Sequence, residues 1–278
     1  MGVALIEQMS KSSYAGVLER IEAALEAARE VFARYTPGKI ETEYKAGHDP
    51  VTEADRALDS VLRKNLLREN DDEGWLSEES ADDLARLDRE RVWVVDPLDG
   101  TREFVQGIPE FCVSIAMVER GRPVAGGICN PATNEVFLGA VGCGLIYNGA
   151  PACASQRSRL QGALVLASRS EAKRREWRQF QSAPFKVQAV GSVAYKLAHV
   201  AAGRADATFT LSPKHEWDIA AGAALVLSAG GYVQLLDGSA LTCNRERPIV
   251  SGLVACGSLL KEELLPFLSL YLRVAPKQ

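Results

Sequence analysis

Residues 92–101 read VWVVDPLDGT, an apolar run that leads directly into two aspartates, a proline and a glycine. The apolar run predicts a buried β-strand, and Pro97 with Gly100 predicts a turn at its end. Such a turn holds Asp96 and Asp99 close together at the edge of a sheet. Because like charges repel and the ligands on offer are oxygens, we expect a Mg²⁺ ion between them. The alternative is an ordinary turn after a core strand.

Further acidic segments accompany this one. DPVTEAD at residues 49–55 leads into a stretch with apolar residues at helical spacing, and EWD at 216–218 opens an alanine-rich run that predicts a helix over 219–229. LSEES at 76–80 places two glutamates after a short apolar run. Together with residues 92–101, these segments supply carboxylates from four separate parts of the chain.

Each acidic segment also has a purely structural interpretation. Thr52 and Asp55 have the spacing of a helix capping box, and Asp218 is a plausible helix cap. Glu78 and Glu79 are compatible with a solvated turn. The four segments become more informative together, because their order along the chain matches one known pattern.

With these segments the chain resembles the Mg²⁺-dependent, lithium-sensitive phosphomonoesterases of the inositol monophosphatase superfamily, over nearly its whole length. DPLDGT at 96–101 is similar to the family's first signature, and EWDIAAG at 216–222 is similar to its second. DPVTEAD at 49–55 and SEES at 77–80 are similar to the remaining metal-site segments, in the family's order. Ser77 stands where the family more often has glycine, a change that leaves the carboxylates in place.

The resemblance implies a site for two Mg²⁺ ions, with a third, weaker ion in addition. Two ions that act together need a carboxylate that both can share, and Asp96 is the candidate for this bridge. The implied ligands are Glu78 and the carbonyl of Leu98 for one ion, and Asp99 and Asp218 for the other. Glu79 is the candidate to reach the third ion through water.

The resemblance also implies that the nucleophile is a water molecule activated by these ions. Thr101 and Asp55 correspond to the pair that orients and deprotonates it, although a satisfied turn hydroxyl is the alternative for Thr101. The N–H groups of Gly100 and Thr101 are expected to bind phosphate oxygens. Lys45 matches a family lysine near the metals, or is a surface residue. The residues expected to contact the substrate are Glu78, Leu98, Asp99, Gly100, Thr101, Asp218 and Arg169.

Substrate choice divides the superfamily. REF at 102–104, LASRS at 166–170 and Glu216 are similar to the 3′(2′),5′-bisphosphate nucleotidases, whereas GIP at 107–109 and YNG at 147–149 are similar to the inositol monophosphatases. The first set favours 3′-phosphoadenosine 5′-phosphate, hydrolysed to AMP and phosphate. Arg169 is then the cation expected at the second phosphate, or a surface residue.

Two other hypotheses stay open at this point. One is an inositol monophosphatase or a related sugar-phosphate phosphatase. The other, from a different class, is a non-catalytic, metal-dependent interaction protein. The second has no support in the sequence, because every expected ligand and the pair Thr101 and Asp55 are present.

Composition narrows the class of protein. The chain has 278 residues, of which 47% are hydrophobic and 24% charged, so it can bury a large core. A net charge of -4 provides no basic face for a nucleic acid polymer, and no apolar run approaches the length of a membrane span. The six cysteines are scattered without a CxxC pair, which predicts reduced core residues in a cytoplasmic protein. The family resemblance implies a homodimer.

The order of the predicted elements indicates two halves. Helices over 14–35 and 53–68 precede strands at 92–96, 111–119, 122–129 and 135–140, an α+β pattern with an antiparallel sheet. From residue 163 strands and helices alternate, which predicts an α/β half. We therefore expect an N-terminal domain at 1–155 with most metal ligands and a C-terminal domain at 156–278 that contributes Asp218. The resemblance implies a five-layer αβαβα sandwich with the active site between the halves.

Overall fold

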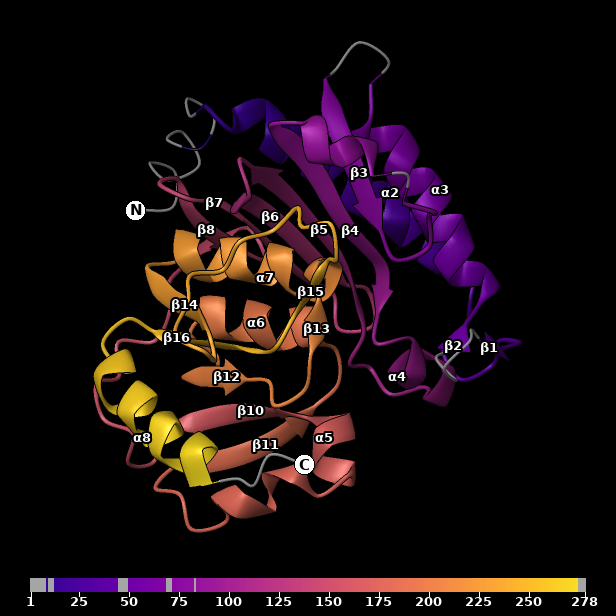
Figure 1. Cartoon of the computed structure of the whole chain (residues 1–278). Coiled ribbons are helices and arrows are strands. Elements are labelled where there is room, and N and C mark those ends of the chain that lie inside the picture. The colour runs from indigo at the N-terminus through magenta and orange to yellow at the C-terminus, as the bar shows by residue number, and fades with distance from the viewer. Residues whose placement is uncertain (1–8, 10–12, 45–49, 69–71, 83, 275–278) are drawn as a thin grey trace.

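The chain folds into five alternating layers of helices and sheets (Figure 1). The computed structural model describes residue 9 and residues 13–44, 50–68, 72–82 and 84–274; Lys45 and Asp49 lie outside this part of the chain. In order, the layers are α2 (Ala15–Phe32) with α3 (Glu53–Leu66), a seven-stranded sheet, α6 (Val193–Ala201) with α7 (Glu216–Ser228), a five-stranded sheet, and α8 (Lys261–Val274) with α5 (Arg169–Lys173). The five-layer sandwich predicted from the resemblance is confirmed.

The seven-stranded sheet is built from consecutive strands of the N-terminal half. Its first pair, β3 and β4, is parallel, and every later neighbour is antiparallel. The strands in spatial order are β3 (Glu73–Ser77), β4 (Arg91–Asp99), β5 (Cys112–Glu119), β6 (Arg122–Asn130), β7 (Glu135–Ala140), β8 (Gly144–Tyr147) and β9 (Ala150–Ala152). The antiparallel sheet expected from the sequence is thus extended by one parallel edge strand.

The five-stranded sheet comes from the C-terminal half and mixes parallel and antiparallel pairs. Its strands in spatial order are β11 (Lys186–Val190), β10 (Leu164–Ser168), β12 (Ala207–Phe209), β16 (Leu253–Gly257) and β14 (Gly231–Leu235). The short elements are β1 (Glu43–Tyr44) paired with β2 (Pro50–Val51), β13 (Lys214–His215) paired with β15 (Ile249–Val250), α4 (Thr101–Gln106), and the 3₁₀ turns η1 (Ala85–Asp88) and η2 (Glu176–Phe180).

Strand β4 is apolar throughout because both of its faces are buried. Successive side chains of a strand point to opposite faces, so Trp93 and Val95 pack with α2 and α3, while Val92 and Val94 pack in the core around α6 and α7. The same alternation determines on which face the residues after Val95 emerge. Asp96 therefore points toward α6 and α7 rather than toward α2 and α3.

Helices α6 and α7 share one core with both sheets. Residues of β4 and β5 on one side and of β16 on the other belong to the same buried cluster around these helices. Of the six cysteines, all are free and all but Cys153 are buried, so the expected core position is wrong for Cys153, which is exposed. Among the described residues, no helix is both long and apolar enough to cross a bilayer.

Gly126 lets α7 approach the seven-stranded sheet. A Cβ atom at this position of β6 would lie 2.6 Å from the carbonyl oxygen of Ala221, which belongs to the backbone of α7. Backbone cannot move aside as a flexible side chain can, so only glycine permits this contact.

We predict that Gly126→Ala destabilises the protein by about 1–3 kcal/mol, the usual cost of overpacking a core. Thermal unfolding followed by circular dichroism measures the effect. Gly16→Ala is the matched control, because a Cβ at Gly16 in α2 meets nothing within 4 Å and alanine favours a helix. If both variants melted at the same temperature, close packing of α7 on β6 would not limit the stability.

Candidate active site

The end of β4 presents carboxylates to the cleft between the halves. Asp96 lies opposite Ser114 of β5, whose hydroxyl donates to the carbonyl of Trp217 at the start of α7 (3.2 Å). The ladder between β4 and β5 shifts register between Asp96 and Asp99, which bends the strand into the turn. Gly100 follows with φ +95°, and a Cβ there would lie 2.9 Å from the carbonyl oxygen of Glu110. Glycine is therefore required for the chain to enter α4 at Thr101.

Helix α3 brings Asp55 to Thr101. Asp55 is the third residue of the helix, and its Oδ2 accepts hydrogen bonds from the backbone N–H and the hydroxyl of Thr52, both at 2.7 Å. This capping box leaves Oδ1 for Thr101, whose hydroxyl lies 3.1 Å away and also 2.9 Å from the carbonyl oxygen of Leu98. Burial, as the largest effect, raises the pKa of Asp55, which makes its carboxylate a better proton acceptor.

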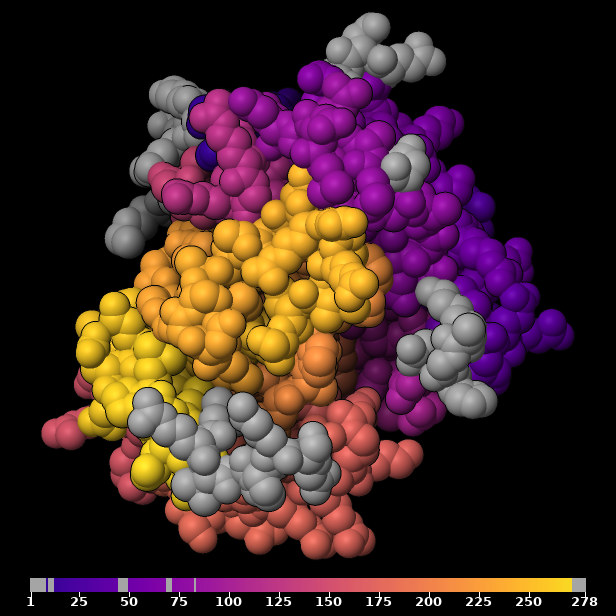
Figure 2. Space-filling view, in the orientation of Figure 1, coloured from indigo at the N-terminus to yellow at the C-terminus, as the bar shows by residue number. Residues whose placement is uncertain are grey.

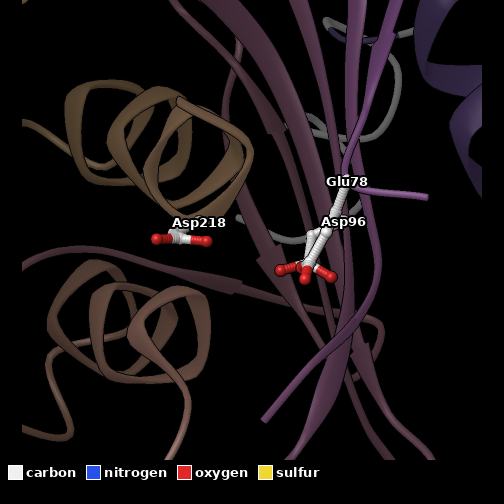
Figure 3. A group of neighbouring side chains, drawn as sticks. All are labelled: Glu78, Asp96 and Asp218. Atoms are coloured by element: carbon white, nitrogen blue, oxygen red, sulfur yellow. The ribbon is translucent and has the colours of Figure 1, made fainter. Parts of the chain in front are cut away.

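Glu78, Asp96 and Asp218 form one compact group of carboxylates (Figure 3). Each offers an oxygen, and these oxygens all lie within 4.8 Å of one another. Glu78 follows the end of β3, while Asp218 sits in the first turn of α7, where it accepts from the backbone N–H of His215 (3.0 Å). Three segments that are far apart in the sequence thus converge on one point.

The carboxylates of this group repel one another. Burial and the nearby charges of Glu78, Asp99 and Asp218 raise the pKa of Asp96 well above its ordinary value. Desolvation in the cleft and the charges of Asp99 and Glu78 do the same for Asp218. A divalent cation would relieve this repulsion, and a donor set made only of carboxylate oxygens suits Mg²⁺.

Asp99 lies in the same cleft but is turned toward α6. Its Oδ2 accepts from the hydroxyl of Ser192 and from the backbone N–H of Ala194, both at 2.6 Å. Asp99 therefore anchors the N-terminus of α6, and the compact group of oxygens consists of Glu78, Asp96 and Asp218 without it. Its charge still reaches the group, because it raises the pKa values of Asp96 and Asp218.

A cleft of about 300 Å³ opens above these carboxylates. Figure 2 shows the recess between the violet N-terminal half and the orange C-terminal half. Glu78, Leu98, Asp99, Gly100, Thr101, Asp218 and Arg169 all line it, as do the cations Arg174, Lys196 and Lys214. The cleft therefore joins an acidic side to a side rich in positive charge.

Other residues singled out from the sequence lie differently. Glu79 is outside the compact group, although its charge raises the pKa of Asp55. Arg169 lines the cleft, but its guanidinium is ion-paired with Glu110 at 2.6 Å. Glu216 is fully buried and accepts from the backbone N–H groups of Asn244 (2.7 Å) and Arg245 (3.1 Å), so it supports a loop rather than lining the cleft.

Lys196 and Lys214 were missed in the sequence analysis. Lys196 interrupts the mostly apolar run VAYKLAHVA, and a lysine in a buried helix was the available signal. Lys214 stands shortly before the EWD segment, at a position without any distinctive pattern. Only the fold brings both of them to the cleft.

Comparison with known proteins identifies the family. The profile described as "Inositol monophosphatase family" matches residues 14–269. The chain is 36% identical over 220 residues to Nus factor SuhB of Xylella fastidiosa, and the aligned region covers 76% of this chain and 78% of that protein. It is 35% identical over 227 residues to inositol monophosphatase 3 of Solanum lycopersicum, covering 77% and 84%. The solved structure of inositol monophosphatase from Anabaena sp. PCC 7120 has a TM-score of 0.78 at 30% identity and covers 95% of this chain and 98% of that one.

The chain belongs to the inositol monophosphatase family. This is a family of Mg²⁺-dependent phosphatases, that is, of phosphoric monoester hydrolases. The all-oxygen group formed by Glu78, Asp96 and Asp218 fits that metal.

We predict that the free energy of unfolding of the metal-free protein falls as the pH rises from the ordinary aspartate pKa of 3.8 toward the raised pKa values of Asp96 and Asp218. The folded protein retains protons on Asp96 and Asp218 that the unfolded chain releases near the ordinary pKa of 3.8, so folding is favoured at the lower pH. Asp96→Asn should flatten this decline and raise the melting temperature at pH 7.5 by about 2–4 °C per kcal/mol of relieved repulsion.

Melting in excess chelator measures this dependence, with Mg²⁺ added back as the comparison. Asp88→Asn, which removes an exposed carboxylate in η1, should retain the wild-type pH profile. A pH profile of Asp96→Asn that matched the wild type would show that the buried carboxylates do not repel one another.

Proposed function

We propose that this protein hydrolyses a small phosphate monoester that carries a second anionic group. The best candidate is a nucleotide bisphosphate, 3′-phosphoadenosine 5′-phosphate, which yields AMP and phosphate. The observation that carries the proposal is the charge distribution in the cleft. The acidic group faces cationic side chains that the C-terminal half contributes, namely Arg169, Arg174, Lys196 and Lys214.

Lys196 supports the proposal because it is a buried cation at the cleft wall. Its ammonium group donates to the carbonyl oxygens of Ser192 (2.8 Å) and Val190 (3.4 Å), and a lysine has one proton more to donate. Burial lowers its pKa to about 8, while Asp99 opposes this shift. At neutral pH Lys196 is therefore still mainly protonated and can bind an anion.

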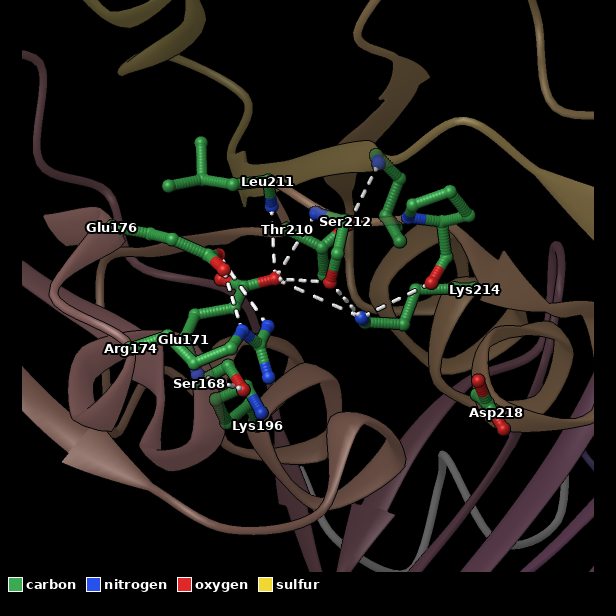
Figure 4. A network of polar contacts seen from close by, with 12 residues as sticks. Ser168, Glu171, Arg174, Glu176, Lys196, Thr210, Leu211, Ser212, Lys214 and Asp218 are labelled. Carbon is green, nitrogen blue, oxygen red and sulfur yellow. Dashed lines mark hydrogen bonds and ion pairs between the residues drawn. The ribbon is translucent and has the colours of Figure 1, made fainter. Parts of the chain in front are cut away.

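Lys214 is held over the cleft by a buried carboxylate (Figure 4). Glu171 accepts from the backbone N–H groups of Leu211 (3.0 Å) and Ser212 (3.2 Å) and from the hydroxyl of Ser212 (2.8 Å). Lys214 in turn donates to Ser212 Oγ at 2.7 Å and lies 3.7 Å from Glu171. Trp177 donates to the other oxygen of Glu171 (3.0 Å), which secures the whole arrangement.

Two of the arginines that line the cleft, Arg169 and Arg174, are partly neutralised. Arg174 pairs with Glu176 at 2.6 Å, and Arg169 pairs with Glu110 at the same distance. Arg102 also lines the cleft, and we propose Lys196 and Lys214 as the main cations that a second phosphate would meet. Arg169 remains a proposed substrate contact at the rim.

The chain's own residues supply the proton transfer. Thr101 accepts a proton from the attacking water while its hydroxyl donates to Asp55 Oδ1, and the raised pKa of Asp55 favours that transfer. Thr52 occupies Asp55 Oδ2 and so keeps Oδ1 aimed at Thr101. The N–H groups of Gly100 and Thr101 orient the phosphate oxygens at the start of α4.

Glu78, Asp96 and Asp218 would hold Mg²⁺, which would neutralise the phosphate and lower the pKa of a bound water molecule. We propose a site for two such ions, for which Asp96, the Leu98 carbonyl and Asp99 would be among the ligands. Glu79 is proposed for a third, weaker ion. The expected sensitivity to lithium belongs to the same proposal.

The names of the relatives favour a second candidate, an inositol monophosphatase. The name Nus factor SuhB points to a third possibility, a role through protein interactions, although the complete set of carboxylates and the contact between Thr101 and Asp55 favour catalysis.

We further propose a homodimer, which sedimentation would test. A cytoplasmic location is supported by the free thiols. The division into domains at 1–155 and 156–278 is also a proposal.

We predict that Thr101→Ala lowers kcat by about 10²–10⁴-fold, the usual contribution of general acid–base catalysis. The Mg²⁺ concentration at half-maximal activity should change little, since the hydroxyl acts on the proton and not on the ion. Thr101→Ser, which retains the hydroxyl, should recover much of the loss. Steady-state assays at varied Mg²⁺ test this, and an equal loss in both variants would contradict the role of the hydroxyl.

We predict that Lys214→Gln lowers kcat/KM for 3′-phosphoadenosine 5′-phosphate by about 10–100-fold, the equivalent of one charge-assisted hydrogen bond. Hydrolysis of inositol 1-phosphate should change by less than about twofold, because that ester has no second phosphate. Lys173→Gln is the control, since Lys173 is exposed and outside this cleft. Phosphate release measured for both esters decides between the candidates.

The wild-type protein provides the first comparison in that experiment. A larger kcat/KM for inositol 1-phosphate than for the nucleotide would establish the second candidate and leave the reaction class unchanged. Arg169→Ala tests the remaining cation, and equal losses for both esters would clear Arg169 of a selective role.

A further inference from the structure

Asp59 lies on α3 one turn after Asp55 and contacts the segment that carries Glu78. Its Oδ1 accepts a hydrogen bond from the hydroxyl of Ser77 (2.5 Å), and its Oδ2 accepts one from the hydroxyl of Ser80 (2.6 Å). Both carboxylate oxygens are therefore used by the first and last residues of the turn 77–80. Glu78 and Glu79 lie between these two anchors.

The hydrogen bonds of the two serines leave the turn little freedom. Each hydroxyl has a single proton, and each gives it to Asp59. As acceptors, Ser77 Oγ receives the N–H of Glu79 (3.4 Å) and Ser80 Oγ receives the indole N–H of Trp75 (3.3 Å). The N–H of Glu78 donates to the carbonyl of Val95 in β4 (3.3 Å), so the turn is also fixed to the strand that carries Asp96.

This arrangement opposes the repulsion that acts on Glu78. Glu78 sits among the charges of Asp96 and Asp218, so like-charge repulsion acts on the turn that carries it. Asp59 holds the turn through neutral hydroxyls and not through the charged oxygens themselves. Because it is on the same helix as Asp55, it also fixes the distance between the proton acceptor and the metal ligand.

We propose that Asp59 is a positioning residue that pre-organises Glu78 for Mg²⁺ by clamping Ser77 and Ser80 to α3. The inference rests on the proposed role of Glu78 as a ligand. Mutation of a residue that orients a metal ligand in this way typically lowers the metal affinity by about 10–100-fold.

Mg²⁺ binding to the metal-free protein, measured by isothermal titration calorimetry, tests the proposal without any substrate. Asp59→Ala should weaken the Mg²⁺ affinity by about 10-fold or more, and Asp59→Asn by less, because an amide oxygen can still accept from one serine. Ser60→Ala, at an exposed position of the same helix, is the control and should bind Mg²⁺ like the wild type. At saturating Mg²⁺, kcat of Asp59→Ala should recover to within about threefold, since Asp59 orients a ligand and does not touch the reacting atoms.

The double variant Ser77→Ala with Ser80→Ala keeps the proposal testable if Asp59→Ala folds poorly. It should weaken Mg²⁺ binding as much as Asp59→Ala does, and combining all three changes should add little. Additive losses, or wild-type affinity in Asp59→Ala, would overturn the clamp. Absence of Mg²⁺ binding in the wild type would instead overturn the proposed function, before any variant is compared.

Discussion

The mutual repulsion of Glu78, Asp96 and Asp218 is the constraint on which the rest of the structure depends. Their oxygens lie within 4.8 Å of one another, and separate parts of the fold hold each in place. Asp96 is fixed by the ladder of β4 and β5, Asp218 by the first turn of α7, and Glu78 by the turn fastened to α3. Repulsion within this group lowers the free energy of unfolding of the metal-free protein, and binding of a divalent cation raises it again.

The family resemblance predicted the layers and most of the acidic site, whereas local patterns predicted individual elements. The apolar run before Asp96 predicted a buried strand, and the spacing of Thr52 and Asp55 predicted the capping box that the structure contains. The segments that carry Glu78 and Asp218 were located through the family resemblance, which orders them along the chain. Their convergence on one point is a property of the fold, which no single segment encodes.

What sequence reasoning missed depends on contacts between distant segments. Lys214 reaches the cleft because Glu171, far away in the chain, binds the loop before it. Glu216 was taken as a marker of substrate choice, yet its carboxylate serves the backbone of Asn244 and Arg245. Arg169 lines the cleft, but its partner Glu110 comes from the other half of the chain and was not foreseeable from either neighbourhood.

Asp99 links the acidic side of the cleft to the position of α6. Its carboxylate caps α6 through Ser192 and Ala194, and Lys196 lies on the first turns of that helix. A substitution at Asp99 therefore alters the acidic side of the cleft and unfastens the helix that carries a cation of the opposite wall. Lys214 sits on a segment that Ser212 and Glu171 support independently of Asp99. Substitutions at Lys214 can therefore change the cationic side of the cleft without disturbing the hydrogen bonds of the acidic side, whereas changes at the start of α6 affect both.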